Sequence, residues 1–228
     1  MMSLALPAWT PPSVPIAGDD TQFPVRRIFC VGRNYAAHAR EMGHDPDREP
    51  PFFFMKPADA VRSDGRFPYP VATGDVHHEI ELVVALGAGG RDVPEATAND
   101  LIWGYGVGLD MTRRDVQAEA KKLGRPWCMA KGFDHSAPIA PLHPKSATGI
   151  LADGAISLTV NGETRQSSVL SALIWSVPET IAYLSGLVEL KAGDLIFTGT
   201  PDGVAAVQRG DRLVGHVDGL TPLSVEVV

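Results

Sequence analysis

The sequence predicts an α+β domain that is rich in strands and has a few helices. Short apolar segments bounded by prolines or turn dipeptides are typical of strands. Apart from one helix, residues 153–228 consist of short strands separated by Asn-Gly, Asp-Gly and Gly-Asp turns, which favour hairpins. Helical patterns occupy three segments, at residues 34–43, 112–124 and 176–187.

Residues 1–24 are predicted to form an extended arm, and residues 25–228 a single domain. The arm contains five prolines, which favour an extended segment on the surface or in solvent: Pro7, Pro11, Pro12, Pro15 and Pro24. A chain of 228 residues is long enough for one large domain with a substantial core.

In the first half of the domain, strands are predicted at residues 25–32, 50–57 and 101–110. The second of these is a brief apolar run between prolines. The short helix predicted at residues 34–43 ends at Gly43, because glycine is a common residue just past a helix C-terminus.

The two other helices have clear signals at their ends. In residues 112–124, Thr112 and Asp115 are placed as a capping box, and lysines lie in the last turn. In residues 176–187, Ser176 is the predicted N-cap, Pro178 lies in the first turn, and Glu179 follows the cap by three residues.

Composition and charge narrow the classes of function. Hydrophobic residues make up 44% of the chain and charged residues 21%, as in an ordinary globular protein. A net charge of −7 argues against nucleic acid or an anionic membrane as the main partner. Cys30 and Cys128 form no CxxC pair, and both are expected to be reduced core thiols. Without a signal-peptide pattern or 18 successive apolar residues, we expect a cytoplasmic protein that binds small molecules.

The segment VHHEIELVVALG, residues 76–87, places two glutamates in an otherwise apolar strand. Side chains alternate along a strand, so one face carries Ile80, Leu82, Val84 and Leu86, and the other carries His77, Glu79, Glu81 and Val83. The two carboxylates, with Cβ atoms about 6 to 7 Å apart, would be able to converge on one cation. The alternative, which is commoner for such pairs, is that both glutamates lie on a solvent-exposed face.

The strand at residues 101–110 has three glycines in phase with an aspartate: Gly104, Gly106, Gly108 and Asp110. Glycines in a strand often mark a close approach to the backbone, which here would leave a cleared face ending at Asp110. With Glu79 and Glu81, Asp110 would then make an all-oxygen site for Mg²⁺, Mn²⁺ or Ca²⁺. The alternative is that the glycines make room for a neighbouring strand or aromatic ring.

Other candidates lie outside these strands. His38 and Glu41 are neighbours on a helix surface, an arrangement that suits a general base acting on water but is also common without function. Lys131, a lone cation in an apolar run, would either stabilise an oxyanion or extend to the surface. In IFTGTPDG, residues 196–203, the backbone N–H groups and the Thr200 hydroxyl would be able to hold a carboxylate.

Six segments occur in the order and spacing of the fumarylacetoacetate hydrolase family: FCVGRNYAAHAREMG, PPFFFMKP, HHEIELVVALG, GYGVGLDMTRRDVQ, GRPWCMAKGFD and DLIFTGTPDGV. The chain resembles this family over nearly everything after the arm, and most closely its small acylpyruvate hydrolase branch. The resemblance implies a mixed β-sandwich roll with peripheral helices, paired into a homodimer.

The resemblance also implies roles for nine residues. Glu79, Glu81 and Asp110 would bind Mg²⁺ or Mn²⁺, with Ca²⁺ as a substitute in crystals. His38 and Glu41 would be the dyad that activates water, and Lys131 would lie near the developing negative charge. The groups that contact the keto acid would be Arg114, Gln117 and Thr200.

The function expected from this resemblance is metal-dependent hydrolysis of the carbon-carbon bond of acylpyruvates. Fumarylpyruvate is the favoured substrate, within a gentisate-type breakdown of aromatic compounds. Its distal carboxylate would need a cation, for which Arg33 and Arg113 are candidates. The alternatives are an oxaloacetate decarboxylase or keto-acid isomerase with the same site, a glycosidase that uses the two glutamates, and a Ca²⁺-stabilised binding module.

Overall fold

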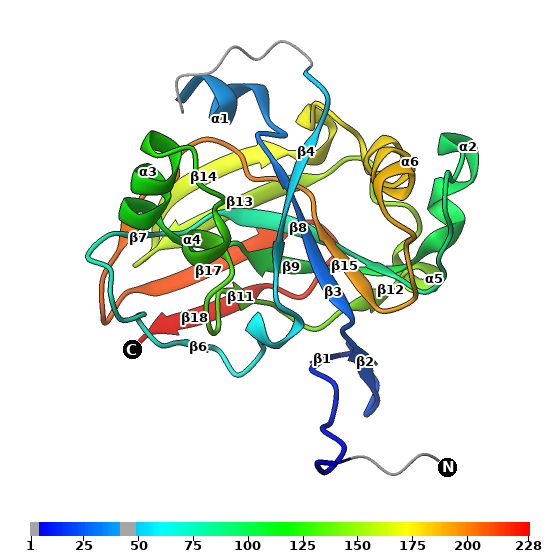
Figure 1. Ribbon diagram of the computed structural model, residues 1–228, viewed down its shortest axis with the longest axis horizontal. Helices are drawn as coiled ribbons and strands as arrows, with labels where there is room; N and C mark the ends of the chain where they lie inside the picture. Colours follow the sequence, from blue (N-terminus) through cyan, green and yellow to red (C-terminus); the bar gives the residue numbers. More distant parts are fainter. Residues whose placement is uncertain (1–4, 42–48) are drawn as a thin grey trace.

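The computed structural model describes residues 5–41 and 49–228 and shows an α+β fold rich in strands (Figure 1). The larger sheet has six strands, in the spatial order β12 (His143–Pro144), β9 (Ile102–Leu109), β8 (Ile80–Leu86), β15 (Asp194–Phe197), β3 (Arg27–Gly32) and β4 (Phe52–Lys56). The other large sheet has five, in the order β14 (Glu163–Val169), β13 (Ala155–Val160), β17 (Arg212–Val217), β18 (Leu223–Val227) and β6 (Arg66–Phe67).

Both sheets are mixed, as the resemblance implied. The strand pairs β15–β3 and β18–β6 are parallel, whereas the other neighbours in the two sheets are antiparallel. Three small sheets complete the fold: β1 (Ser13–Pro15) with β2 (Gln22–Pro24), β11 (Ala137–Pro138) with β5 (Val61–Arg62), and β7 (Val76–His77) between β10 (Thr112–Arg113) and β16 (Ala206–Val207).

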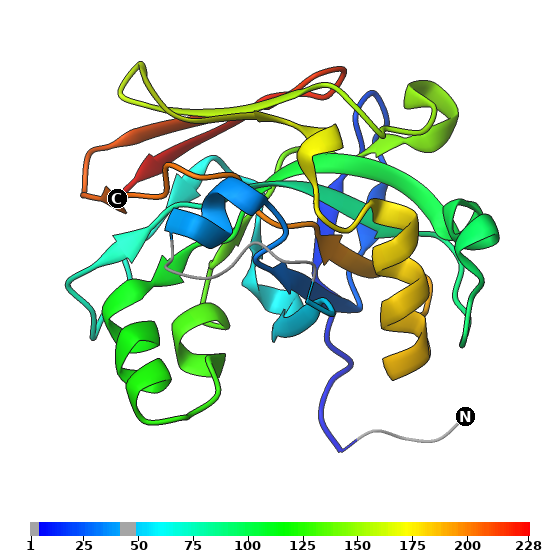
Figure 2. The same cartoon turned by 90° about the horizontal axis from the view of Figure 1, so that it is seen from above.

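The helices lie at the periphery. They are α1 (Ala36–Glu41), α2 (Glu95–Ala98), α3 (Arg114–Lys122), α4 (Cys128–Lys131), α5 (Lys145–Thr148) and α6 (Val177–Leu187), with 3₁₀ turns at Ala58–Ala60, Asn99–Leu101 and Leu170–Ala172. Seen from above, the five-stranded sheet lies over the six-stranded one, and α3 and α4 stand at the opposite end from α6 (Figure 2). None of the helices in the described ranges is long and apolar enough to cross a membrane.

Strand β8 is buried on both faces, and this places its glutamates inside the molecule. Its even-numbered residues, Ile80 to Leu86, belong to the core cluster shared with the five-stranded sheet. Val83 and Ala85 point to the other side, into a second cluster that includes residues of β1, β2, β3 and β15. The predicted alternation is therefore confirmed, but neither face of the strand is exposed to solvent.

The predicted helix at residues 176–187 is confirmed, and the predicted start of the helix at 112–124 is wrong. Helix α6 has the capping box, in which the Ser176 hydroxyl accepts from the backbone of Glu179 and the Glu179 carboxylate accepts from the backbone of Ser176. Helix α3 begins at Arg114 without a side-chain cap, because Thr112 lies in β10, paired with His77 of β7.

Three other expectations concern the N-terminal part and the cysteines. The predicted arm contains the β1–β2 hairpin, whose Val14 and Phe23 are buried; its division from one catalytic domain stays a proposal. The predicted helix end at Gly43 lies outside the described residues. Cys30 is buried as expected, whereas Cys128 is exposed at the start of α4, so its assignment to the core was wrong.

Candidate functional site

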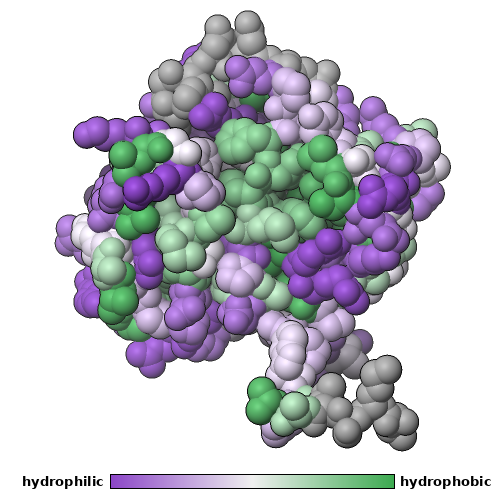
Figure 3. Space-filling view, in the orientation of Figure 1, coloured by the Kyte–Doolittle hydropathy of each residue, from purple (hydrophilic) through white to green (hydrophobic). Residues whose placement is uncertain are grey.

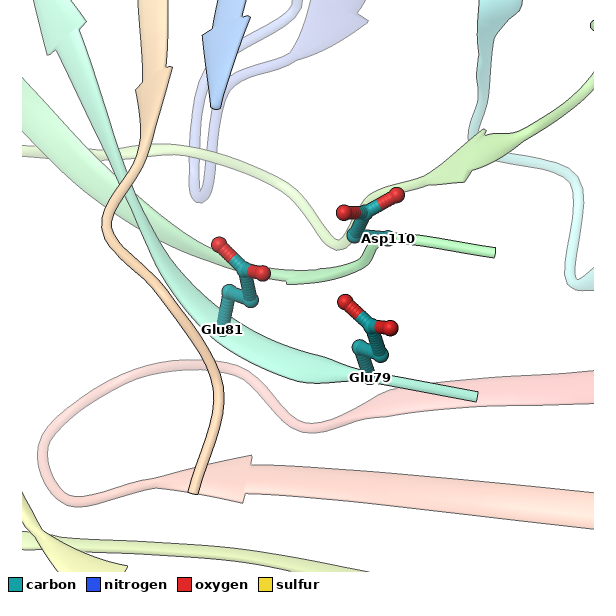
Figure 4. A group of neighbouring side chains, drawn as sticks. All are labelled: Glu79, Glu81 and Asp110. Carbon is teal, nitrogen blue, oxygen red and sulfur yellow. The ribbon is translucent and has the colours of Figure 1, made fainter. Parts of the chain in front are cut away.

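The pairing of β8 with β9 brings three carboxylates together. Glu79 directly precedes β8, Glu81 lies within it, and Asp110 directly follows β9. Ile80 pairs with Leu109, and the Asp110 N–H donates to the Glu79 carbonyl at 2.8 Å, so the strand ends are fixed in register. One oxygen from each carboxylate lies within 4.8 Å of the other two, and the three side chains lie next to one another (Figure 4).

The three acidic residues are buried. Glu79 is 5% exposed, Glu81 1% and Asp110 0%. The alternative in which Glu79 and Glu81 lie on a solvent-exposed face is therefore wrong. Burying three carboxylates is costly unless cations compensate for them.

Three cationic side chains surround the carboxylates. Lys131 donates to Glu79 Oε2 at 2.8 Å and to Asp110 Oδ2 at 2.6 Å. Arg114 donates to Glu79 Oε1 at 2.5 Å. Lys56, which the sequence reasoning missed, lies fully buried with its Nζ 2.8 Å from Asp110 Oδ1. Its signal in the sequence was a single lysine that ends the apolar run of β4.

The positive charges are distributed unevenly over the triad. Burial by itself would raise the pKa of Glu79, but Lys131 and Arg114 outweigh it and hold that pKa well below its usual range. Burial raises the pKa of Glu81 well above its usual range, and the negative charges of Asp110 and Glu79 add to this effect. The hydrogen bond from the Gly199 N–H to Glu81 Oε2, at 2.7 Å, opposes the rise only in part. Within the described residues, Glu81 forms no ion pair with a cation.

These residues fit a divalent cation. Asp110 Oδ1 has Lys56 as an ion-pair neighbour but accepts no hydrogen bond from the residues that the structure describes. Three carboxylate oxygens at this spacing are the hard ligands that Mg²⁺, Mn²⁺ and Ca²⁺ prefer. A dication would supply the positive charge that Glu81 lacks.

The glycines of β9 serve packing rather than a ligand. A Cβ atom on Gly104 would lie 2.1 Å from the His143 carbonyl oxygen of β12. A Cβ atom on Gly108 would lie 2.6 Å from Val83 and 2.7 Å from the Phe197 ring. The interpretation of a face cleared for the cation was wrong, and the alternative, room for a strand and an aromatic ring, is correct.

The His38–Glu41 pair lies on α1. The Nδ1 of His38 is 3.2 Å from Glu41 Oε2, and the ring is buried. The Gly203 N–H approaches both Glu41 oxygens, at 3.1 and 3.2 Å, which fixes the carboxylate and through it the imidazole. Within residues 5–41 and 49–228, the other ring nitrogen of His38, Nε2, forms no hydrogen bond and is available for proton transfer.

One pocket unites most of the predicted residues. Its lining consists of Val31, Gly32, Arg33, His38, Phe52, Phe54, Glu79, Glu81, Arg114, Gln117, Lys121, Trp127, Lys131 and Thr200. Glu41 and Asp110 are not among the lining residues, but each contacts one of them: Glu41 contacts His38, and Asp110 contacts Lys131. Of the two candidates for a distal carboxylate, only Arg33 lines the pocket. Arg113 instead has its guanidinium 4.5 Å from the centre of the Phe133 ring.

The predicted keto-acid contacts come from α3 and from the turn after β15. The Arg114 guanidinium donates to the Gln117 side-chain oxygen at 2.6 Å, which holds both in the first turn of α3. Thr200 Oγ1 accepts from the Gln166 amide at 2.8 Å. The turn was predicted to hold a carboxylate with its backbone N–H groups. Its N–H groups at Gly199 and Gly203 hold Glu81 and Glu41 of the protein itself.

The chain belongs to the fumarylacetoacetate hydrolase family: residues 27–228 match the model described as fumarylacetoacetate (FAA) hydrolase C-terminal. It is similar to fumarylpyruvate hydrolase from Pseudomonas aeruginosa, whose crystal structure is a complex with Mn²⁺ and pyruvate. That similarity has 57% identity and a TM-score of 0.97, and covers 99% of each chain.

Oxaloacetate tautomerases are also similar to this chain. The tautomerase YcgM from Escherichia coli (strain K12) is 45% identical over 86% of this chain and 90% of its own length. The mitochondrial tautomerase FAHD1 from Homo sapiens is 43% identical over 89% of this chain and 91% of its own length. The family and the fold are thereby shown, and its members include both hydrolases and tautomerases.

Proposed function

We propose that this protein is a metal-dependent acylpyruvate hydrolase that converts fumarylpyruvate and water into fumarate and pyruvate. The observation that carries the proposal is that a single pocket is lined by His38, Lys131 and two of the triad carboxylates, Glu79 and Glu81. The similarity to the Pseudomonas fumarylpyruvate hydrolase supports it, because it extends over 99% of both chains, whereas the tautomerase similarities cover 86 and 89% of this chain.

In this mechanism, His38 Nε2 accepts a proton from water while the water oxygen adds to the acyl carbonyl carbon. Glu41 keeps the imidazole in the orientation and tautomer that a base requires. Lys131 donates hydrogen bonds to the oxyanion that develops on the former carbonyl oxygen. The bond between the acyl carbon and the methylene carbon then breaks, and its electron pair leaves as the enolate of pyruvate. Return of the proton to the methylene carbon gives pyruvate.

Glu79, Glu81 and Asp110 would hold the cation, for which we propose Mg²⁺ or Mn²⁺, with Ca²⁺ as a substitute in crystals. When bound, such a cation supplies Lewis-acid polarisation of the keto-acid oxygens. Arg114, Gln117 and Thr200 would orient the pyruvyl end, because all three line the same pocket. Arg114 is already fixed by Glu79 and Gln117, so little of its freedom is lost on binding.

We also propose a cytoplasmic homodimer that acts in gentisate-type aromatic catabolism. Apolar surface over β4 and α6 supports the dimer (Figure 3). There Met55 is 47% exposed and Leu187 59%, while the rings of Phe53 and Tyr183 stack with centres 6.3 Å apart. Exposed apolar patches of this kind commonly mark protein interfaces.

Tautomerisation of oxaloacetate is the second candidate function, favoured by the names of the curated relatives. It needs a base and an acid at the keto acid but breaks no carbon-carbon bond, and the same pocket offers both. Decarboxylation of oxaloacetate by the same residues is a further variant. The glycosidase and calcium-module alternatives have lost their support, because neither accounts for membership in this family.

A product assay tests the proposal. Wild-type protein with Mn²⁺ is incubated with fumarylpyruvate, acetylpyruvate and oxaloacetate, and fumarate, acetate, pyruvate and enol-keto exchange are followed by NMR. We expect equal amounts of fumarate and pyruvate, loss of turnover with EDTA, and a fall of about 10²- to 10⁴-fold for His38→Ala. If the protein exchanges the enol and keto forms of oxaloacetate but cleaves no acylpyruvate, the hydrolase proposal is wrong and tautomerisation of oxaloacetate takes its place.

A further inference from the structure

The pocket extends beyond the carboxylate triad along one face of α3. Arg114, Gln117 and Lys121 are spaced three and four residues apart, so they lie on the same face of the helix, and all three line the pocket. A rise of 1.5 Å per residue places Lys121 about 10 Å along the helix axis from Arg114. The pocket therefore has one end at the triad and another near Lys121.

Three aromatic rings lie between these ends. The centre of the Trp127 ring is 5.5 Å from that of Phe52 and 6.1 Å from that of Phe54. The Lys131 ammonium is 4.8 Å from the centre of the Phe54 ring, so the aromatic surface begins beside the triad. Such a surface suits flat, conjugated carbon atoms better than a flexible polar chain.

Two cations stand at the far side of the rings. The Arg33 guanidinium is 5.2 Å from the centre of the Phe52 ring, and the Lys121 ammonium is 5.2 Å from the Trp127 ring. In the part of the chain that the structure describes, neither forms an ion pair, whereas Arg114, Lys131 and Lys56 are all paired with carboxylates. Arg33, Arg114 and Lys121 all line the same pocket. Burial lowers the pKa of Lys121, and the charges of Arg114 and Arg33 lower it further.

The backbone at this end is shaped for the same arrangement. Arg33 has a φ of 57°, in the left-handed region that a side chain rarely adopts. The preceding Gly32 allows the Phe52 ring to lie against the chain, because a Cβ atom there would be 2.0 Å from that ring. An uncommon conformation held at a pocket wall points to a binding role for the residue.

We propose that Arg33 and Lys121 bind a second carboxylate at the far end of the substrate, and that Phe52 and Trp127 pack on its planar unsaturated carbons. The site would thereby select acylpyruvates whose acyl group is itself a short unsaturated acid. This inference rests on the proposed function and assigns the residues that would set its acyl specificity. Six bonds join the two carboxyl carbons of fumarylpyruvate, which spans roughly 7.5 Å when extended. That length is close to the separation of Arg114 and Lys121 along α3.

The test uses the Mn²⁺-loaded protein and two substrates that differ in the distal carboxylate, fumarylpyruvate and acetylpyruvate. The double variant Arg33→Gln/Lys121→Gln should lower kcat/KM for fumarylpyruvate by about 100-fold, mainly through KM, since contacts to an ionised group are among the stronger hydrogen bonds. The loss on acetylpyruvate should be at least ten times smaller. Lys122→Gln, which changes the adjacent exposed lysine of α3, is the matched control. It should leave the ratio of kcat/KM for fumarylpyruvate to kcat/KM for acetylpyruvate unchanged.

Binding is measured separately, so that a failure of this inference is distinct from a failure of the proposed function. In protein made inactive by His38→Ala, calorimetry should show fumarylpyruvate binding at least tenfold more tightly than acetylpyruvate, and the double variant should abolish that difference. Equal losses on both substrates, or an unchanged preference for fumarylpyruvate, would overturn the inference. If the wild type cleaves neither substrate yet the binding difference depends on Arg33 and Lys121, the inference stands and the hydrolase proposal falls.

Discussion

The two ends of the pocket treat charge in opposite ways. At the triad, the acidic residues and the lysines around them are buried, and Lys56, Lys131 and Arg114 are all in contact with carboxylates. At the far end, Arg33 and Lys121 are more accessible and contact aromatic rings. Buried, paired charges are fixed in position, whereas Arg33 and Lys121, which form no ion pair in the described part of the chain, are able to meet a ligand.

This contrast separates two tasks within one site. The triad end has the groups that hydrolysis and tautomerisation of a keto acid would share in our proposal, namely ligands for a cation, a base and a lysine. The far end carries the two cations that, in our proposal, bind only an acyl group with a second carboxylate. Relatives named for fumarylpyruvate and for oxaloacetate belong with this chain to one family, and a change at the far end alone would account for different substrates.

The largest effect is expected for Glu81→Gln, which would break the triad end. Loss of one negative ligand should weaken Mn²⁺ binding and lower kcat/KM by about 10³-fold, because Lewis-acid stabilisation is worth several kcal/mol. In EDTA the same variant should unfold at a higher temperature than the wild type. Its amide keeps the acceptor for the Gly199 N–H and removes a buried charge that lacks its own cation.

Calorimetric Mn²⁺ titration, steady-state kinetics and thermal unfolding in EDTA measure these effects. Glu226→Gln, at an exposed glutamate of β18, is the control and should change none of them. A lower unfolding temperature for Glu81→Gln in EDTA would mean that the negative charge of Glu81 is already compensated by neighbouring cations, and that a dication is not needed to balance it.

A second, smaller effect is expected for Lys56→Met. The variant leaves Asp110 without one of its two buried cations and removes the donor to the carbonyls of Met111 and Lys131. In EDTA we expect a loss of about 3 kcal/mol in the free energy of unfolding, as is typical when one partner of a buried pair is removed. Saturating Mn²⁺ should reduce that loss, since a dication supplies positive charge to Asp110.

Urea unfolding of wild type and variant, each with EDTA and with Mn²⁺, gives the two differences. Lys122→Met, at an exposed position of α3, controls for the loss of a lysine and should change stability little. A loss of the same size with and without Mn²⁺ would indicate that Lys56 acts by packing alone, for example through its contact with Phe133.

The fold was predictable where local signals and burial agree. The predicted capping box of α6 is present because Ser176 and Glu179 are three residues apart and each side chain accepts from the other's backbone N–H. At α3 the same pattern failed, because the Thr112 hydroxyl donates to Glu79 Oε1 and to the Asp110 carbonyl, both at 3.3 Å. Glu79, directly before β8, is far from Thr112 in the sequence, so the spacing of Thr112 and Asp115 contains no information about this contact.

The sequence predicted which residues form the carboxylate triad, but not which cations contact it or how the pocket residues are arranged. Alternation along β8 gave the side on which Glu79 and Glu81 lie, and the pattern of residues 101–110, followed by the family resemblance, linked them to Asp110. The position of Lys56 depends on the antiparallel pairing of β4 with β3 at the edge of the sheet, which a single strand pattern does not specify. The same holds for Arg33 and Lys121, which come from separate elements and meet only through the aromatic rings between them.

The smallest effect is expected for Asp115→Ala, which would loosen the helix that joins the two ends. Asp115 Oδ1 accepts from the Thr73 hydroxyl at 2.6 Å and the Val116 N–H at 2.8 Å, and Oδ2 accepts from the Gly74 N–H at 2.9 Å. This ties the first turn of α3 to the loop before β7. We expect a loss of about 1 kcal/mol, the net worth of an ordinary hydrogen bond, and an unfolding temperature lower by about 2 to 4 °C.

The dependence of this loss on pH tests whether the Asp115 carboxylate is the cause. Burial would raise its pKa slightly, but the hydrogen bonds from Thr73, Gly74 and Val116 outweigh it and hold the pKa below the ordinary value of 3.8. A carboxyl whose pKa is lowered by folding stabilises the protein above its unfolded pKa, and that contribution is lost as pH falls through the folded pKa. The difference between wild type and variant should therefore be full at pH 7 and smaller at pH 3. Glu119→Ala, at an exposed site of the same helix, should show no such change.

Because α3 carries Arg114 and Lys121 together, any fall in kcat/KM of Asp115→Ala should be equal for fumarylpyruvate and acetylpyruvate. A selective fall on one of them would mean that the two ends are positioned independently of this helix.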